Sequence, residues 1–157
     1  MKTAETAIAD YVAALEAMRP DTIDTVLDLC AETVRFTDPF NDVTGRAALR
    51  HVFEDMFDKV SELTFTVDDC QGSDRTWLLR WTYAGRMGAL GHTRIEGMSH
   101  VVLDEDNRVC RHADYWDAGI LYEKIPLIGR VIRGIRRRIS ASRHPRHGGT
   151  GSSPRQA

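Results

Sequence analysis

The chain has 157 residues, of which 42% are hydrophobic and 28% charged, a length and balance typical of one globular domain. No stretch approaches the roughly 18 uncharged apolar residues of a membrane span, and acidic residues near the N-terminus argue against a secretion signal. The three cysteines lie far apart and predict reduced thiols, so we expect a cytoplasmic protein without disulfides.

The net charge of −2 hides a strong asymmetry along the chain. Residues 1–123 carry 12 Lys and Arg against 23 Asp and Glu, a balance of −11. Residues 124–157 carry 9 basic residues and no acidic residue, a balance of +9. An acidic domain is therefore joined to a basic tail, and such a tail predicts a charged partner.

The first third of the sequence predicts three helices. Apolar residues recur at helical spacing over about residues 4–18, and Pro20 ends this helix. Asp21 is expected to cap a second helix that runs to Cys30. The third helix presents an apolar stripe over residues 49–60.

Strand patterns surround and follow the third helix. A short alternating segment, Val34–Asp38, precedes it and ends at Pro39. After Ser61 the hydrophobic period changes to two, and four strands are predicted at Leu63–Asp69, Thr76–Met87, Thr93–Leu103 and Arg108–Asp117. Three helices followed by four strands indicate an α+β domain with the helices packed on one face of an antiparallel sheet. The glycines at positions 85, 88 and 91 predict a hairpin rather than a phosphate-binding loop.

The sequence of the basic tail predicts two segments. Residues 123–140 are expected to form an amphipathic helix in which isoleucines and a valine make one stripe. The other faces carry arginines: Arg130, Arg133, Arg136, Arg137 and Arg138. Residues 141–157 are rich in Gly, Ser and Pro and are predicted to be disordered.

The sequence leaves three kinds of partner open for this basic helix. Its apolar stripe could pack against the domain or against a second copy of the chain. Alternatively, its arginines could bind an anionic membrane surface, which would make the protein peripheral at the inner membrane face. Nucleic acid is the least favoured partner, because the tail lacks aromatic stacking residues and a recognised motif.

The order of elements resembles that of a known superfamily. A strand that ends in Phe36-Thr37-Asp38-Pro39, a glycine at position 45, a helix, and four long strands that close with Asp114-Tyr115-Trp116-Asp117 resemble the nuclear-transport-factor-2-like superfamily. Within it, the chain is most similar to SnoaL-like proteins, which include polyketide cyclases and are related to ketosteroid isomerases. The resemblance covers about residues 4–122, taken as one domain within 1–122. It implies a cone-shaped fold around an apolar pocket, and a homodimer.

The resemblance to ketosteroid isomerases also implies roles for individual residues. Asp38 matches the catalytic base, and Tyr11 matches the helix-borne tyrosine that donates to the developing oxyanion. The position of the second oxyanion donor, a protonated aspartic acid in the isomerases, holds Ser99 instead. This departure argues against steroid isomerisation itself.

The last predicted strand adds a second candidate acid/base pair. His112 and Asp114 are two residues apart, so their side chains lie on one face of the strand, roughly 6–7 Å apart along it. Either could act as general acid or base. The alternative is a buried structural pair.

Further residues are predicted to line a pocket for a hydrophobic ligand. They share inward-facing parity on the strands or match pocket positions of the resembling family: Phe65, Trp77, Trp81, Ser99 and Trp116. A mostly apolar chamber with a few polar groups is typical of a small-molecule site.

Two functions remain open from the sequence. The first is a cofactor-free enzyme of the isomerase or cyclase type, which moves protons on a hydrophobic, lipid-like or polyketide-like substrate. The second is a non-catalytic carrier of a lipid-like ligand, held near a membrane by the basic helix. The histidines are scattered without metal-ligand spacing, so we expect neither a metal nor a cofactor.

Overall fold

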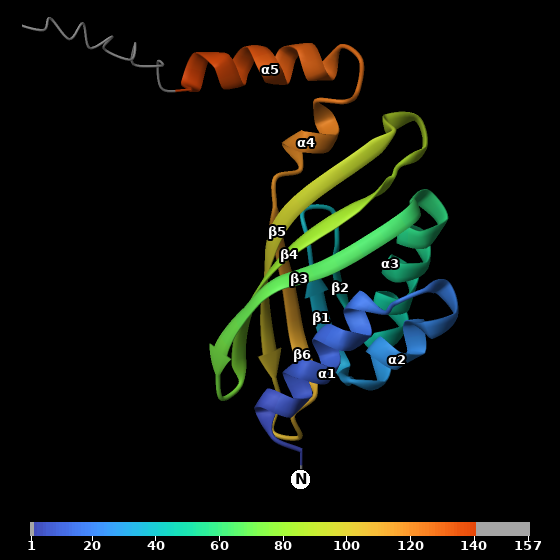
Figure 1. Cartoon of the computed structure of the whole chain (residues 1–157), viewed down its shortest axis with the longest axis vertical. Coiled ribbons are helices and arrows are strands. Elements are labelled where there is room, and N and C mark those ends of the chain that lie inside the picture. The colour runs from blue at the N-terminus through green and yellow to red at the C-terminus, as the bar shows by residue number, and fades with distance from the viewer. Residues whose placement is uncertain (1, 141–157) are drawn as a thin grey trace, which may run out of the picture.

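The computed structural model describes residues 2–140 of the chain (Figure 1). The predicted disordered segment, 141–157, lies outside the described residues. Helical elements occupy both ends of the described chain and two segments between them: α1 (Ala4–Glu16), η1 (Pro20–Thr22), α2 (Ile23–Asp28), α3 (Arg46–Lys59), η2 (Gly88–Leu90), α4 (Gly119–Tyr122) and α5 (Ile128–Ile139).

All strands belong to one six-stranded sheet with the order β2-β1-β6-β5-β4-β3. The strands are β1 (Cys30–Thr37), β2 (Asp42–Thr44), β3 (Ser61–Ser73), β4 (Thr76–Arg86), β5 (His92–Leu103) and β6 (Val109–Trp116). β1 and β6 are parallel, while the other neighbours are antiparallel. The sheet is therefore mixed, whereas the sequence predicted an antiparallel one. The long excursion between β1 and β6 supplies the crossover that a parallel pair requires.

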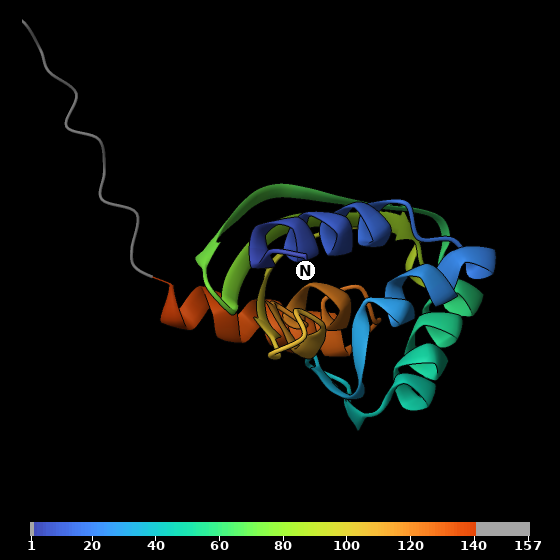
Figure 2. The same cartoon turned by 90° about the horizontal axis from the view of Figure 1, so that it is seen from below.

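The sheet is strongly curved and curls around α1, while α2 and α3 cover its open side (Figure 2). One source of the curvature is a register shift between β3 and β4 at Val67–Asp69, because a bulge bends the strand that contains it. The concave face holds the core. Tyr11, Leu79 and Val101 are fully buried there, and the α+β architecture is confirmed.

Several local details differ from the sequence prediction. The second helix begins with the 3-10 turn η1, and the Thr22 hydroxyl accepts the Arg19 N–H at 2.8 Å, so Asp21 is not the cap. Cys30 lies in β1 rather than in the helix. The loop after Asp38 contains the short strand β2, which pairs with the end of β1. β4, η2 and β5 form the hairpin expected from the glycine cluster.

Candidate functional site

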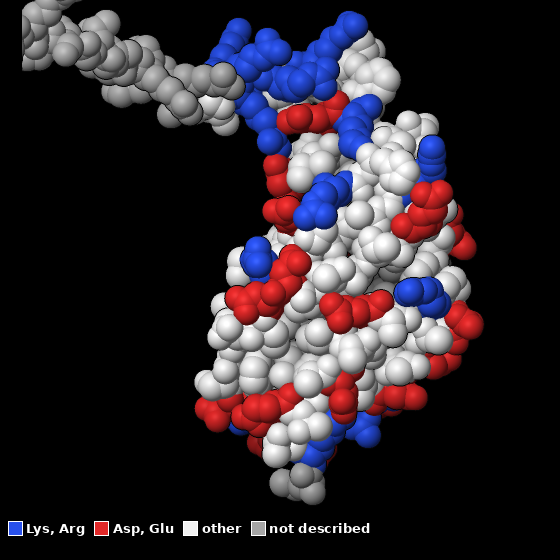
Figure 3. Space-filling view, viewed as in Figure 1, with Lys and Arg blue, Asp and Glu red and all other residues white. Residues whose placement is uncertain are grey.

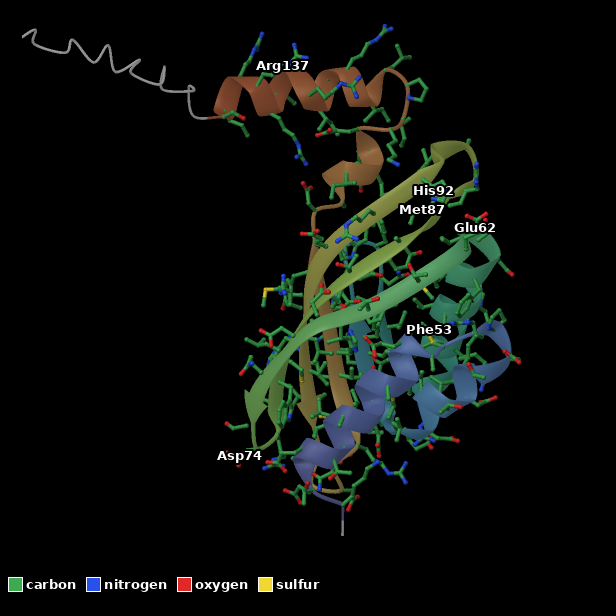
Figure 4. The ribbon with its side chains drawn as sticks, in the orientation of Figure 1. Phe53, Glu62, Asp74, Met87, His92 and Arg137 are labelled. Atoms are coloured by element: carbon green, nitrogen blue, oxygen red, sulfur yellow. The ribbon has the colours of Figure 1, made fainter. Side chains whose placement is uncertain are left out.

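A cavity of about 960 Å³ opens between the concave face of the sheet, the end of α1 and the inner side of α3. Figure 4 labels two of its lining residues, Phe53 on α3 and Met87 just beyond β4. The cavity wall is mainly apolar, with contributions from Leu15, Phe36, Phe53, Phe65, Trp81, Ile95, Trp116 and Leu121. Asp38, His112 and Asp114 interrupt this apolar wall at the ends of the adjacent strands β1 and β6. The remaining acidic, basic and imidazole groups of the wall come from α1, the turn after it and α3: Glu16, Arg19, His51, Asp55, Asp58 and Lys59.

The histidine connects the cavity to a buried tyrosine. His112 is 4% exposed, and its Nδ1 lies 2.8 Å from the hydroxyl of Tyr11, which is completely buried. On the other side of the ring, Nε2 lies 2.7 Å from Oδ1 of Asp114. Residues that are 101 positions apart in the sequence thus form one hydrogen-bonded chain, Tyr11–His112–Asp114.

The hydroxyl of Tyr11 is protonated in this chain of hydrogen bonds. Burial, first of all, raises the pKa of Tyr11 well above its ordinary value, and the charge of nearby Asp114 adds to that shift. Tyr11 therefore remains a neutral phenol, whose O–H can donate to Nδ1 of His112. In the tautomer that carries its proton on Nε2, His112 donates to Asp114, and both ring nitrogens are hydrogen-bonded.

Ser99 is the second side chain that hydrogen-bonds to Asp114. Its hydroxyl donates to Oδ1 of Asp114 at 2.5 Å and accepts the indole N–H of Trp81 at 2.8 Å. Ser99 and Asp114 are direct partners across β5 and β6, and Trp81 faces Gly97 across β4 and β5. A Cβ at position 97 would collide with the Trp81 ring, so the glycine leaves room for the indole to reach Ser99.

The two oxygens of Asp114 consequently have different surroundings. Oδ1 accepts bonds from both His112 and Ser99. Among the described residues, Oδ2 has no hydrogen-bond partner, and the Asp114 side chain is 18% exposed where it lines the cavity. This geometry holds the carboxylate rigidly while one oxygen stays free for a ligand.

Asp38 also lines the cavity, but its carboxylate is engaged in a turn. Oδ1 accepts the backbone N–H groups of Phe40 at 2.7 Å and Asn41 at 2.6 Å, and the Asn41 side chain bonds both oxygens. This is an Asx-type turn, which stabilises the reversal after β1. Asp38 follows Thr37, the partner of Ala113, so Asp38 and Asp114 lie at the same end of adjacent parallel strands.

The other predicted site residues divide into two groups. Phe65, Trp81 and Trp116 line the cavity. Trp77 and Ser99 do not line it: Trp77 lies in the core with its indole N–H bonded to the carbonyl of Asp74, and Ser99 is fully buried behind Asp114. Tyr11 likewise lies behind His112, so its hydroxyl is bonded to His112 rather than presented to a ligand.

Tyr83 is a further polar residue of the cavity wall, outside the set of predicted site residues. It lies on β4, two residues beyond Trp81 and on the same face, and it lines the cavity. Burial raises the pKa of Tyr83 to about 12, which keeps its hydroxyl protonated and able to donate. The alternation of side chains along β4 indicates that Tyr83 shares a face with Trp81. That this face lines the cavity is visible only in the structure.

Within residues 2–140, no cluster of three or more His, Cys, Asp and Glu side chains is arranged to hold a metal ion. The polar groups on the sheet side of the cavity suit proton transfer and hydrogen bonding, since they include the carboxylates of Asp38 and Asp114, the imidazole of His112 and the phenol of Tyr83.

Comparison with known proteins identifies the family. The sequence profile of the SnoaL-like domain matches residues 8–112, which is most of the folded domain. The chain belongs to the SnoaL-like family. No curated protein matches it.

Solved structures confirm the nuclear-transport-factor-2-like fold of this SnoaL-like chain. An NTF2-like protein from Burkholderia thailandensis is similar over 79% of this chain and 98% of its own, with 15% identity and a TM-score of 0.69. A candidate polyketide cyclase from Pseudomonas putida covers 80% of this chain and 99% of its own, at 17% identity and a TM-score of 0.65. A protein with a ketosteroid isomerase-like fold from Catenulispora acidiphila, in complex with trimethylamine, covers 75% of this chain and 90% of its own, at 12% identity and a TM-score of 0.64.

Proposed function

We propose that this SnoaL-like protein is a cofactor-free enzyme that transfers protons on a hydrophobic small molecule, in an isomerisation or cyclisation. The observation that carries the proposal is the asymmetry of Asp114. One carboxylate oxygen is fixed by His112 and Ser99, and the other is free in a largely apolar cavity. A carboxylate held in this way is suited to act as a general base on a substrate with few polar groups.

The proposed reaction begins with a carbonyl compound whose neighbouring carbon carries an acidic hydrogen. Oδ2 of Asp114 takes this proton, so the C–H bond breaks, an O–H bond forms, and the electron pair moves onto the carbonyl oxygen as an enolate. The neutral Tyr83 hydroxyl can donate to that oxygen. Where a carbon–carbon double bond is conjugated with the enolate, return of the proton from Asp114 to the far carbon restores the carbonyl and completes an isomerisation. Where the substrate has a second carbonyl, attack of the enolate carbon on it closes a ring, and the proton from Asp114 neutralises the new alkoxide.

The remaining members of the chain act through Asp114. His112 donates to Oδ1, and Tyr11 fixes the imidazole from behind in the required tautomer. Tyr11 is a positioning residue, since it does not line the cavity, whereas His112 both lines the cavity and positions Asp114. Asp38 is the second carboxylate at the same end of the cavity, and it can receive or return the proton when the two carbons are far apart.

Deuterium exchange tests the proposal without knowledge of the natural substrate. The protein is incubated in D2O with a panel of hydrophobic ketones and diketones, and deuterium incorporation beside the carbonyl is followed by mass spectrometry. Asp114→Asn should slow exchange by about 10²–10⁴-fold, the usual contribution of a general base. Asp106→Asn, in the exposed turn before β6, is the matched control and should leave exchange unchanged. Equal exchange by wild type and Asp114→Asn would refute the proposed role of Asp114.

The second candidate function is a carrier of a lipid-like ligand, favoured by the size and apolar character of the cavity. Mass spectrometry of the denatured protein would identify a copurified ligand. A carrier would retain its ligand unchanged in D2O, whereas the proposed enzyme would exchange or convert it.

We also propose that the protein is a homodimer through the convex face of the sheet. Leu78, Met98 and Tyr115 lie on that face and are 46%, 46% and 60% exposed. Exposed apolar side chains on neighbouring strands support an interface. Light scattering of the wild type should give twice the monomer mass. The double variant Met98→Glu with Tyr115→Glu should give the mass of one monomer.

A further inference from the structure

Helix α5 leaves its apolar stripe in solvent. The exposed fractions of the apolar side chains at its start and along one face lie between 48% and 78%: Leu127, Ile128, Val131, Ile135 and Ile139. Figure 1 shows α5 at the end of the molecule, beyond α4 and away from the sheet. Packing of this stripe against the chain's own domain, one of the alternatives open from the sequence, is therefore not what the structure contains.

The helix instead meets the domain through a polar side. Arg136 forms ion pairs with Asp117 and, at 2.7 Å, with Glu123. Arg133 donates to the Glu123 carbonyl at 2.8 Å. Gly129 is buried against the same residue, where a Cβ would collide with the Glu123 backbone.

These contacts orient the apolar stripe away from the domain. Successive residues of a helix are rotated by about 100° around the helix axis. Gly129, Arg133 and Arg136 therefore lie on a side of α5 that is turned by roughly 100° from the middle of the apolar stripe. The ion pairs and the glycine thus hold α5 with Ile128, Ile135 and Ile139 exposed, while Ile132 is partly buried. The stripe needs an apolar partner that the described residues do not supply.

The charge around the stripe indicates what that partner is. Among the described residues, Arg130, Arg137 and Arg138 make no ion pair, and the sequence has no Asp or Glu after Glu123. Figure 3 shows Lys and Arg gathered on α5, while Asp and Glu are spread over the domain below. Figure 4 places Arg137 on α5, clear of the domain.

We propose that α5 docks flat on an anionic lipid surface. Its isoleucines would enter the acyl boundary, and its three unpaired arginines would bind the headgroups. An anionic bilayer offers apolar and negative groups in one plane, as the helix requires. A second α5 would bring five more arginines, and their repulsion disfavours a helix pair. None of the helices in residues 2–140 is long and apolar enough to cross a membrane, and α5 has 12 residues, or about 18 Å.

Vesicle co-sedimentation of the full chain tests this proposal. The probes are vesicles of phosphatidylcholine alone and vesicles in which one third is phosphatidylglycerol. Wild-type protein should sediment with the anionic vesicles, release at high salt, and stay in solution with the neutral ones. Each arginine contributes about fivefold to partitioning, so Arg130→Gln, Arg137→Gln and Arg138→Gln together should weaken it about 100-fold.

Two further variants separate the contributions. Val131→Ser with Ile135→Ser keeps every charge but removes part of the apolar stripe, and it should also weaken binding. The matched charge control changes three exposed arginines of the domain, Arg75, Arg86 and Arg108, to Gln and should bind as wild type. All the changed residues are exposed, so circular dichroism and thermal unfolding should show that the variants fold.

Three outcomes would overturn the proposal. The first is no sedimentation of the wild type with anionic vesicles. The second is equal loss of binding in the helix variant and in the domain control, which would indicate a general charge effect. The third is self-association in lipid-free solution that Val131→Ser with Ile135→Ser abolishes, because α5 would then be an interface between copies of the chain.

Discussion

The substitution Tyr11→Phe isolates the buried end of the hydrogen-bonded chain. It removes one hydroxyl that lies 2.8 Å from Nδ1 of His112 and leaves the ring in place. Because His112 is 4% exposed, Nδ1 would become a buried polar atom without a hydrogen-bond partner. An unsatisfied buried group costs about 1–3 kcal/mol, and a chain of this size loses about 2–4 °C in Tm for each kcal/mol.

Urea unfolding followed by tryptophan fluorescence measures this cost. The midpoint should fall with an unchanged m-value, since the substitution alters neither fold nor exposed surface. Tyr122→Phe is the matched control, because Tyr122 is 40% exposed and its replacement should change the free energy of unfolding by less than about 0.5 kcal/mol. If Tyr11→Phe is as stable as this control, the Tyr11–His112 bond does not hold the imidazole.

Three further results are expected. Gly97→Ala should destabilise the fold by about 1–3 kcal/mol, because its Cβ would displace the Trp81 ring; unchanged stability would mean that the ring moves freely. The pKa of Tyr83 is raised to about 12 in the folded protein, so its stabilising contribution is present below pH 10 and lost as the pH rises toward 12. An ultraviolet titration should show a phenolate step near pH 12 that is missing in Tyr83→Phe. Burial also raises the pKa of Cys30 to about 12, so a thiol reagent at pH 8 should modify Cys30 only after denaturation, while the other two cysteines react faster; rapid labelling of native Cys30 would contradict its burial.

Much of the fold followed from local patterns. The period of 3.6 identified α1 and α3, and the period of two identified β3 to β6, because each pattern reports which face of an element is buried. The same parity correctly placed His112 and Asp114 on one face of β6. These predictions needed no knowledge of the partner strand.

Features that depend on distant contacts could not be derived in this way. The parallel pairing of β1 with β6 and the bond between Tyr11 and His112 join segments separated by most of the domain. The role of Arg136, which ties α5 to Asp117, depends on the turn through α4. Periodicity predicted the apolar stripe of α5 but not which side of the helix meets the domain.

The most direct test of the proposed chemistry measures exchange and binding on the same variant. Asp114→Asn should bind a hydrophobic ketone that wild type exchanges with nearly unchanged affinity, because the cavity wall is intact, and should lose the exchange. Loss of both together would assign Asp114 to ligand binding, and retention of both would contradict the proposal that Asp114 transfers the proton.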